Sequence, residues 1–448
     1  MNPTLWSRHG RDRPILTLFA LFVAWKSLII LVTLAAPGVG YDTSTSLLSW
    51  KDGRDRIIST TPDDMSSEWL KFVRWDAVYY AHLSDQGHVF EQEWAFGIGQ
   101  STAMSWTSRC LSRLGITSDP PSLLAGILLS HIAHWLSVIQ LWALTKVLTG
   151  ADQATNSLLP FAAAALHIFS PAGVFLAAPQ SESVFACLSM SGFLGYIHAT
   201  QHFHRGLVFA GCATIICVGM SFGTATMVRS NGILAGIPFL IEALSSVMAI
   251  FFQGLSASRF SRLASVVAGG VLVAFGMVYP QARAYWEYCY GRGAEDKRSW
   301  CNQTVPSIFT WVQSHYWNVG PFRYWTVSNL PLFLLAAPML WVLIYSTVDV
   351  IRHPRLLIRR APQSPTPASA GERVLLSLAL PQLILALLAL TSYHVQIITR
   401  ISSGYPLWYI WLATKLQTES KRTSVVIRWM VIYALIQAGL YASFLPPA

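Results

Sequence analysis

An Arg-Trp-Asp triplet, Arg74-Trp75-Asp76, is the part of this 448-residue chain best suited to proton transfer. It lies in a long polar stretch between the first two apolar runs, so a carboxylate stands beside the expected membrane with a cation close by. A positioned carboxylate can accept a proton from a reacting hydroxyl, which makes Asp76 a candidate general base. The alternative is that Arg74 and Asp76 are only solvated neighbours on an amphipathic helix, residues 71–80, lying on the membrane surface.

Few other carboxylates lie at or inside the expected membrane boundary, namely Glu91, Glu93, Glu182 and Glu242. An ionisable group at that depth costs several kcal/mol unless it is paired or hydrated, so each is a functional candidate. Glu91 and Glu93 could together hold a divalent cation through oxygen ligands, but two acids two apart are common by chance. Glu182 follows Ser181, and this pair either caps the first turn of a helix or turns the acid toward a cavity.

The motif 229–232 (RSNG) places an arginine between two apolar runs, on the same expected side as Asp76. An arginine there can hold a phosphate through two parallel hydrogen bonds, or it can simply extend its charge from the membrane to the interface. Arg400 has the same two interpretations. We take Arg229, Asn231 and Arg400 as candidate substrate-binding residues, together with Arg74, Trp75 and Glu182.

The segment 286–325 is dense in aromatic residues, which either form a belt at the membrane interface or stack on sugar rings. They are Trp286, Tyr288, Tyr290, Trp300, Trp311, Tyr316, Trp317, Tyr324 and Trp325. Cys289 and Cys301 flank a short stretch and can form a disulfide in an oxidising compartment. Asn302-Gln303-Thr304 is a glycosylation sequon.

The composition requires a membrane around these residues. The chain is 53% hydrophobic and only 12% charged, too little charge to cover a soluble protein of this length. Continuous apolar runs indicate helices rather than a barrel. We predict an all-α polytopic membrane protein, one domain over 1–448, with about eleven spans. The expected spans are 15–36, 122–148, 157–178, 181–200, 206–228, 232–253, 263–285, 326–348, 373–391, 396–415 and 424–444.

The net charge of +10 sits mostly in short loops, so we interpret it as a topological signal rather than as a nucleic-acid surface. The first apolar run reads as an uncleaved anchor with a cytoplasmic N-terminus. Basic loops, including a linker over 349–373, then fall on the cytoplasmic side. The long loop 37–121, carrying Asp76, and the loop 286–325 fall on the opposite, luminal side.

The chain lacks an Asp-x-Asp motif of the kind that binds a metal ion and a nucleotide-sugar pyrophosphate, and Gly97-Ile98-Gly99 is too short for a phosphate loop. Its histidines show no zinc-ligand spacing. These observations argue against a soluble nucleotide-sugar donor. We expect no bound metal ion and no cofactor.

Seven motifs in order along the chain resemble GPI mannosyltransferase 2, the PIG-V family. They are RWDAVYY (74–80), GHVFEQEWAF (87–96), SPAGVFLAAPQSES (170–183), RSNG (229–232), YCYGRGAEDKRSWCN (288–302), NLPLFLLAAP (329–338) and RISSGYPLWYIW (400–411). Each motif alone is modest, whereas the ordered set covers nearly the whole chain and is specific.

The resemblance implies a GT-C type glycosyltransferase of the endoplasmic reticulum membrane. It implies transfer of the second mannose, in α-1,6 linkage, from dolichyl-phosphate-mannose to the mono-mannosylated GPI precursor, on the luminal side. The family's catalytic Asp falls on Asp76 and its nearby Glu on Glu91, and fungal members work with a small accessory membrane protein. One departure is that the family's Phe-Phe-Pro type sequence is replaced here by Phe96-Gly97-Ile98-Gly99.

Three other functions compete with this interpretation. A related dolichyl-phosphate-sugar transferase would differ only in its acceptor, an N-glycan precursor or a protein. A transporter or flippase would carry ionisable residues deep in several spans together with internal repeats, and we find no repeat. A scaffold subunit would have no need of the acids and arginines gathered on one side.

Overall fold

The computed structural model describes residue 10 and residues 12–37, 68–118, 120–150, 158–293, 295–357 and 368–443. Within these residues the secondary structure is helical and contains no strand, which confirms the all-α prediction. Eight helices of the described chain are long and apolar enough to cross a membrane, so the protein is a multi-pass membrane protein. They are α2, α6, α9, α10, α11, α13, α14 and α17.

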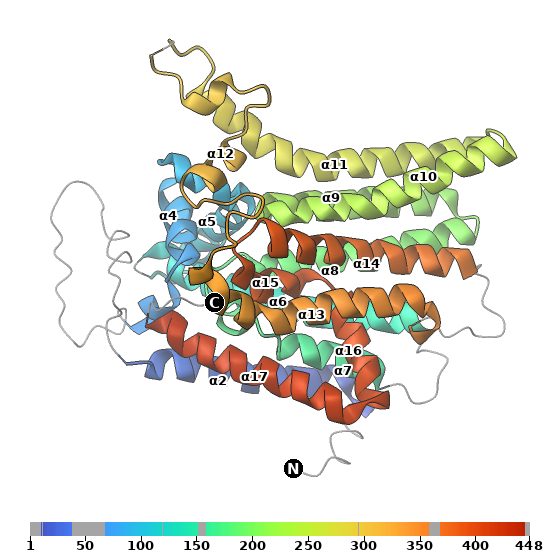
Figure 1. Ribbon diagram of the computed structural model, residues 1–448, viewed down its shortest axis with the longest axis horizontal. Helices are drawn as coiled ribbons and strands as arrows, with labels where there is room; N and C mark the ends of the chain where they lie inside the picture. The colour runs from blue at the N-terminus through green and yellow to red at the C-terminus, as the bar shows by residue number, and fades with distance from the viewer. Residues whose placement is uncertain are drawn as a thin grey trace.

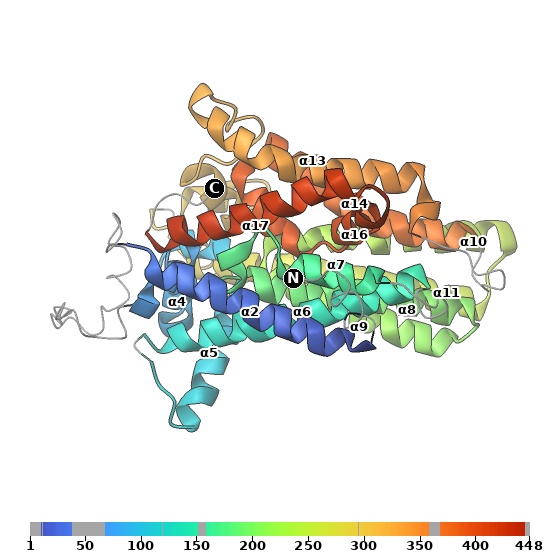
Figure 2. The ribbon, with the colours of Figure 1, turned by 90° about the horizontal axis from the view of Figure 1, so that it is seen from below.

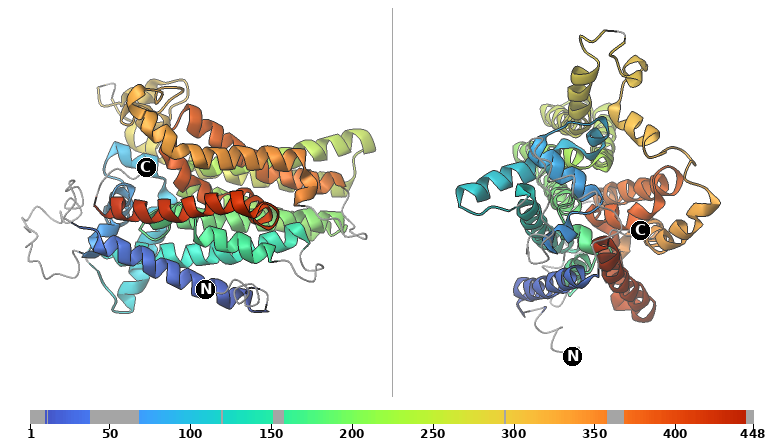
Figure 3. Two further views of the ribbon diagram at one scale, coloured as in Figure 1. Left: turned by 60° about the horizontal axis from the view of Figure 1, so that its bottom comes forward. Right: turned by 90° about the vertical axis from the view of Figure 1, so that its left-hand side faces the viewer.

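The long helices lie side by side in one bundle (Figures 1 and 2) and are seen end-on in the right-hand view of Figure 3. Their bounds are α2 Pro14–Ala35, α6 Pro121–Thr149, α8 Glu182–His204, α9 Val208–Val228, α10 Gly236–Gln253, α11 Ala257–Tyr288, α13 Leu330–Arg352, α14 Ala368–Thr391 and α17 Ser420–Ala442. The shorter helices are α4 Asp76–Gln86, α5 Ile98–Arg113, α7 Leu159–Ile168, α12 Ile308–His315, α15 Ile398–Ile401 and α16 Leu407–Thr418.

Short 3₁₀ turns connect these helices. They are η2 Leu70–Phe72, η3 Glu91–Phe96, η4 Gly173–Leu176, η5 Ser230–Ala235, η6 Ser299–Asn302, η7 Val327–Asn329, η8 Pro354–Leu356, η9 Val395–Ile397 and η10 Ser402–Gly404.

Three of the eleven expected spans are not long apolar helices. The span expected over 157–178 ends as α7 at Ile168, because Pro171 disfavours helix before it and the chain turns through η4. The span expected over 396–415 is broken at Gly404 and Pro406 and leaves the twelve-residue α16. The span over 181–200 forms the 23-residue α8, which is less apolar and is enclosed between α6 and α9. The count of eleven is therefore not confirmed.

The two expected loops contain helices of their own. Residues 68–118 hold α4, η3 and α5, and residues 38–67 lie outside the described chain. The second loop begins only after α11 ends at Tyr288 and contains α12. The linker expected over 349–373 is partly helical, since α13 runs to Arg352 and α14 begins at Ala368, with residues 358–367 outside the description.

The elements α4, α5 and α12 gather at the left-hand end of the bundle in Figure 1, whereas α10 meets α11 at the right-hand end. We call the first the cavity end. The second is rich in basic side chains near the helix ends: Arg205, Arg259, Arg262, Arg352, Arg355, Lys415, Lys421 and Arg422.

Close contacts between helices hold α9 and α16 in place. A Cβ on Gly219 of α9 would meet the Cα of Gly269 of α11 at 2.6 Å, so small residues let these helices touch along their backbones. The buried side chain of Gln382 donates to the Leu343 carbonyl at 2.9 Å and accepts from the backbone N–H of Trp408 at 3.1 Å. It thereby satisfies a donor in the first turn of α16, which has no partner within its own helix.

Candidate active site

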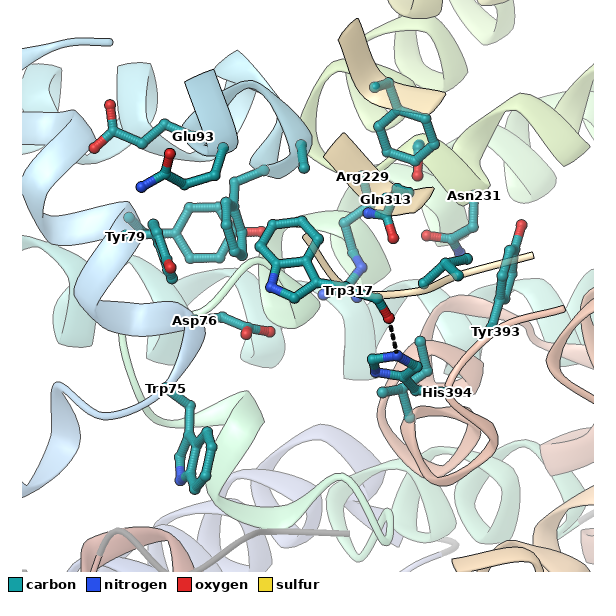
Figure 4. Close-up of a pocket in the computed structure, with 18 of the residues that line it drawn as sticks. Trp75, Asp76, Tyr79, Glu93, Arg229, Asn231, Gln313, Trp317, Tyr393 and His394 are labelled. Carbon is teal, nitrogen blue, oxygen red and sulfur yellow. Dashed lines mark hydrogen bonds between the residues drawn. The ribbon is translucent and has the colours of Figure 1, made fainter. Parts of the chain in front are cut away.

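A cavity of about 1180 Å³ opens at the cavity end, and four segments far apart in sequence line it. They are residues 75–96, 228–231, 309–320 and 393–401. Figure 4 shows Asp76 and Tyr79 on one side of the cavity, Arg229 and Asn231 behind it, and His394 on the other side.

Asp76 reaches this cavity through a strained turn. It is the first residue of α4, and Trp75 before it has φ 54° and ψ −129°. A bulky residue rarely adopts positive φ, and such strain costs of order 1–3 kcal/mol. The turn lets the chain enter α4 with the Asp76 carboxylate facing the cavity, at 35% exposure. The helix expected over 71–80 is confirmed only from Asp76 onward, because residues 70–72 form a separate turn and α4 begins at Asp76.

A network of two acids and two arginines surrounds this carboxylate. Arg400 Nη2 donates to Asp76 Oδ2 at 2.6 Å, and Arg400 Nε donates to Glu182 Oε1 at 2.9 Å. Arg229 Nη1 donates to the same Glu182 oxygen at 2.9 Å. Glu182 is fully buried between the two guanidinium groups. The four formal charges cancel, which is what makes ionised groups tolerable at this depth.

The chain around Glu182 holds the network in place. The guanidinium of Arg400 lies 4.1 Å from the ring centre of Phe175, a favourable cation–π contact. Lys26 of α2 donates to the Leu176 carbonyl at 2.6 Å, which satisfies backbone in the non-helical stretch before α8. Ser181 Oγ accepts from Arg229 Nη1 at 2.7 Å, so the residue before Glu182 also holds the Arg229 guanidinium.

The two tyrosines of α4 remain hydrogen-bond donors at neutral pH. Burial raises the pKa of Tyr80 to about 12, and its hydroxyl donates to Ser181 Oγ at 2.9 Å. Burial, with the nearby charge of Asp76, also raises the pKa of Tyr79, which lines the cavity. Neither phenol can act as a proton acceptor near neutral pH, so neither tyrosine competes with Asp76 for the role of base.

The expected substrate-binding residues divide into two groups. Trp75, Arg229, Asn231 and Arg400 line the cavity. Arg74 does not line it: the side chain is buried and donates from Nε to the Ala442 carbonyl at 3.4 Å, joining the segment before α4 to α17. Glu182 lies one contact behind the cavity wall, through Arg229 and Arg400.

Glu91 and Glu93 turn to different partners. Glu91 accepts from the Trp300 indole N–H at 2.7 Å and from the Tyr316 hydroxyl at 3.2 Å, outside the cavity lining. Glu93 lines the cavity, but one of its oxygens caps the turn by accepting from the backbone N–H groups of Val89 and Phe90. Across the described residues there is no cluster of three or more His, Cys, Asp or Glu side chains able to hold a metal ion.

A disulfide closes the segment that follows α11, beside Glu91. Cys289 and Cys301 are bonded, with Cα atoms 5.6 Å apart, and Trp300 next to them is completely buried. Asn302 follows and is exposed, so the sequon is sterically open to a glycan.

The Gly97 and Gly99 departure has a packing reason. A Cβ on Gly97, which has φ +65°, would meet the Met227 carbonyl at 2.5 Å, and one on Gly99 would meet the Val228 side chain at 2.8 Å. The start of α5 therefore packs directly on the last turn of α9, immediately before Arg229. These two glycines allow α5 to pack on the residues directly before Arg229.

The sequence assigned no site role to several cavity residues, including Tyr79, Gln313, Tyr393 and His394. Trp317 stood out only as one of many aromatics. His394 donates from Nε2 to the Trp317 carbonyl, 2.8 Å away (Figure 4). Tyr79 lies in the motif 74–80, whereas Gln313, Tyr393 and His394 lie in none of the seven motifs, because their place in the cavity comes from contacts between loops that are distant along the chain.

Comparison with known proteins identifies the family. Residues 15–448 match the family model described as Mannosyltransferase (PIG-V). A curated relative from Aspergillus oryzae, named GPI mannosyltransferase 2, is 40% identical over 98% of this chain and 96% of its own. Relatives of the same name from Aspergillus fumigatus and Chaetomium globosum are both 42% identical, over 97% of this chain and 94% and 96% of theirs.

Among solved structures, the Archaeoglobus fulgidus oligosaccharyltransferase with a tethered acceptor peptide superposes with a TM-score of 0.48 at 13% identity. This chain is matched over 98% of its length and spans 56% of the archaeal chain. The family match over nearly the whole sequence, and not this distant likeness, carries the assignment. The chain belongs to the PIG-V mannosyltransferase family and is a glycosyltransferase.

Proposed function

We propose that this protein adds the second mannose to the glycosylphosphatidylinositol precursor. The donor is dolichyl-phosphate-mannose, the acceptor is the mono-mannosylated precursor, and the new bond is α-1,6. The names of the relatives support the acceptor, and the observation that carries the chemistry is Asp76 in the cavity, held by Arg400. The GT-C type architecture implied by the resemblance belongs to this proposal.

The reaction is an inverting single displacement. The donor is a β-linked mannosyl phosphate and the product an α-mannoside, so one in-line attack suffices. The acceptor 6-hydroxyl attacks the anomeric carbon, Asp76 accepts its proton, and the bond from that carbon to the phosphate oxygen breaks. Arg400 occupies Asp76 Oδ2, which leaves Oδ1 for the proton. A positioned base of this kind contributes about 10²–10⁴-fold to the rate.

Arg400 and Arg229 have different roles in this mechanism. Arg400 holds the base, whereas Arg229 takes the phosphate. Arg229 contacts Glu182 and Ser181 through Nη1 alone, and its Nη2 makes no hydrogen bond to any residue in the described part of the chain. The four charges cancel before substrate enters, and negative charge grows on the departing phosphate. Preorganised guanidinium donors stabilise that charge, so the mechanism requires no metal ion or cofactor.

Glu91 acts at one remove in this scheme. The resemblance assigns it a catalytic role, and its contacts to Trp300 and Tyr316 support a positioning role instead. It ties η3 to the second luminal segment, whose residues 309–320 form a cavity wall.

The membrane orientation follows the charge distribution. The short connections at the end opposite the cavity carry basic side chains such as Arg259, Arg355 and Lys421, as the positive-inside rule expects of a cytoplasmic face. The Cys289–Cys301 bond lies at the cavity end and fits an oxidising lumen. We therefore propose an endoplasmic reticulum membrane protein with a cytoplasmic N-terminus and a luminal active site, working with a small accessory membrane subunit.

Membranes containing the protein, supplied with radiolabelled dolichyl-phosphate-mannose, test the proposal. They are given either the mono-mannosylated GPI precursor or an N-glycan precursor. We expect label in the GPI lipid that an α-1,6-specific mannosidase removes. We expect the N-glycan precursor to gain no more label than it gains with membranes that lack the protein. Label only in the N-glycan precursor or in protein would replace GPI as the acceptor class.

A further inference from the structure

The aromatic residues of the second luminal segment have separate positions in the structure. Of those named in the sequence, Trp317 is the one that lines the cavity. Trp300 is buried with its N–H on Glu91, and Trp325 donates its N–H to the Leu390 carbonyl. Trp286 is 66% exposed and stacks on Tyr290, away from the cavity. An interfacial belt accounts for exposed rings such as Trp286, but not for a ring in the cavity.

The Trp317 ring is held by its neighbours on two sides. It makes a T-shaped contact with Phe96, with ring centres 5.6 Å apart, and Phe96 stacks on Tyr79 of α4 with ring centres 4.4 Å apart. On the other side, the Trp317 carbonyl is bonded to His394 Nε2 at 2.8 Å. The following backbone is pinned too, since Gly320 N–H donates to the Ser392 carbonyl at 3.2 Å. A ring positioned in this way loses little freedom when a ligand binds.

The surroundings of the ring suit a sugar. The indole N–H of Trp317 donates to no residue in the described ranges, and the ring is only half-buried. Gln313 and Thr310 of α12 line the same wall and offer an amide and a hydroxyl. Figure 4 shows the indole standing in the cavity between Tyr79 and His394. An apolar ring face with polar groups at its edge matches a pyranose, which has an apolar C–H face and a polar rim.

We propose that Trp317 is the stacking platform for a hexopyranose ring of one of the two substrates, with Gln313 beside it. This inference rests on the proposed glycosyl transfer. The ring belongs either to the acceptor glycan or to the mannose of the donor, and both present the same stacking face. Trp317 then contributes to substrate binding, and proton transfer stays with Asp76.

Trp317→Phe and Trp317→Leu separate a stacking face from bulk, because leucine fills space without a ring. KM for acceptor and for donor is measured with each variant, normalised to folded protein, beside Trp286→Leu as the matched control. We expect Trp317→Leu to raise KM for one substrate about tenfold, Trp317→Phe to stay within about threefold of wild type, and Trp286→Leu to change nothing. The substrate whose KM rises identifies the source of the ring.

Equal kinetics for the Phe and Leu variants, whether both normal or both impaired, would overturn the proposal, as would a loss confined to kcat. If the Leu variant does not accumulate, Trp317→Met serves as the ringless variant under the same criteria. The wild-type reaction in the same assay reports on the proposed function separately. If wild type uses a different glycan acceptor, KM is measured for that acceptor, and the stacking proposal is still tested.

Discussion

Glu182 and Glu242 are both buried glutamates paired with arginine, yet their neighbourhoods differ. Glu242 of α10 is paired with Arg262 of α11, whose guanidinium lies 4.7 Å from the ring centre of Phe203. This pair joins α10 to α11, which meet at the end of the bundle opposite the cavity (Figure 1), and neither residue lines the cavity. Glu182 instead holds two arginines, which line the cavity, and one of these extends the chain of contacts to Asp76.

The difference shows what separates a structural ion pair from a site. Glu242 and Arg262 neutralise each other and join two helices, and neither side chain lines the cavity. At Glu182 one acid neutralises parts of two cations, so each cation retains capacity for a second partner. A second acid and a cavity complete the arrangement. A buried ion pair alone is weak evidence for function, and the added partners and access carry the inference.

The largest expected effect at the Glu182 site comes from Asp76→Asn. The amide keeps the shape of the side chain but cannot accept the proton, so we expect the rate of mannose transfer to fall by about 10²–10⁴-fold. Initial rates in membranes, with protein amount measured by immunoblot, check this. More than a tenth of wild-type activity at normal protein amount would remove Asp76 from the role of base.

The matched pair Glu182→Gln and Glu242→Gln tests the two regions against each other. Each leaves a cation with a weaker partner, and breaking a buried pair costs about 3–5 kcal/mol, so both variants should lose thermal stability in detergent. Only Glu182→Gln should also lower the transfer rate of the protein that remains folded, because it frees Arg400 and Arg229. Equal specific activities of the two folded variants would erase the distinction drawn here.

Arg229→Lys should produce a smaller, more selective change. Lysine keeps the charge but loses the planar fork that binds phosphate through two hydrogen bonds. We expect KM for dolichyl-phosphate-mannose to rise about tenfold while KM for the acceptor stays constant. Arg262→Lys at the other end is the control and should leave both values unchanged. A rise in acceptor KM alone would move the phosphate away from Arg229.

Glu91→Gln should give the smallest effect. The amide oxygen can still accept from Trp300, although a hydrogen bond to a charged group is worth about 1.5–3 kcal/mol against about 1 for a neutral one. We expect a small loss of thermal stability and a transfer rate within about threefold of wild type. A loss as large as that of Asp76→Asn would restore Glu91 to the reaction itself.

The sequence was sufficient for the class of protein and for the charged residues of the site, and insufficient for their directions. Rare charges beside apolar runs pointed to Asp76, Glu182, Arg229 and Arg400, because ionised groups persist there only when paired. Arg74 lies two residues from Asp76, yet it turns to the last helix, since the positive φ of Trp75 separates their paths. No residue pattern encodes such a turn.

The same limit applies to the broken helices. Pro171 and Pro406 mark the interruptions, but hydropathy continues across them, so the expected spans ran through. The backbone groups released there are satisfied by distant side chains such as Lys26 and Gln382. Such contacts depend on which helices become neighbours in space, and local composition does not contain that information.

The burial of Glu182 has a consequence for how the chain is made. Its two partners lie 47 and 218 positions further along the sequence. While the ribosome is still translating, α8 must pack between α6 and α9 with an acid whose second cation does not yet exist. The early helices can settle only provisionally, and a chain that stops before residue 400 would keep one arginine of the pair and leave Asp76 without its own. The site of this enzyme is thus complete only after Arg400 has been translated and has paired with Glu182 and Asp76.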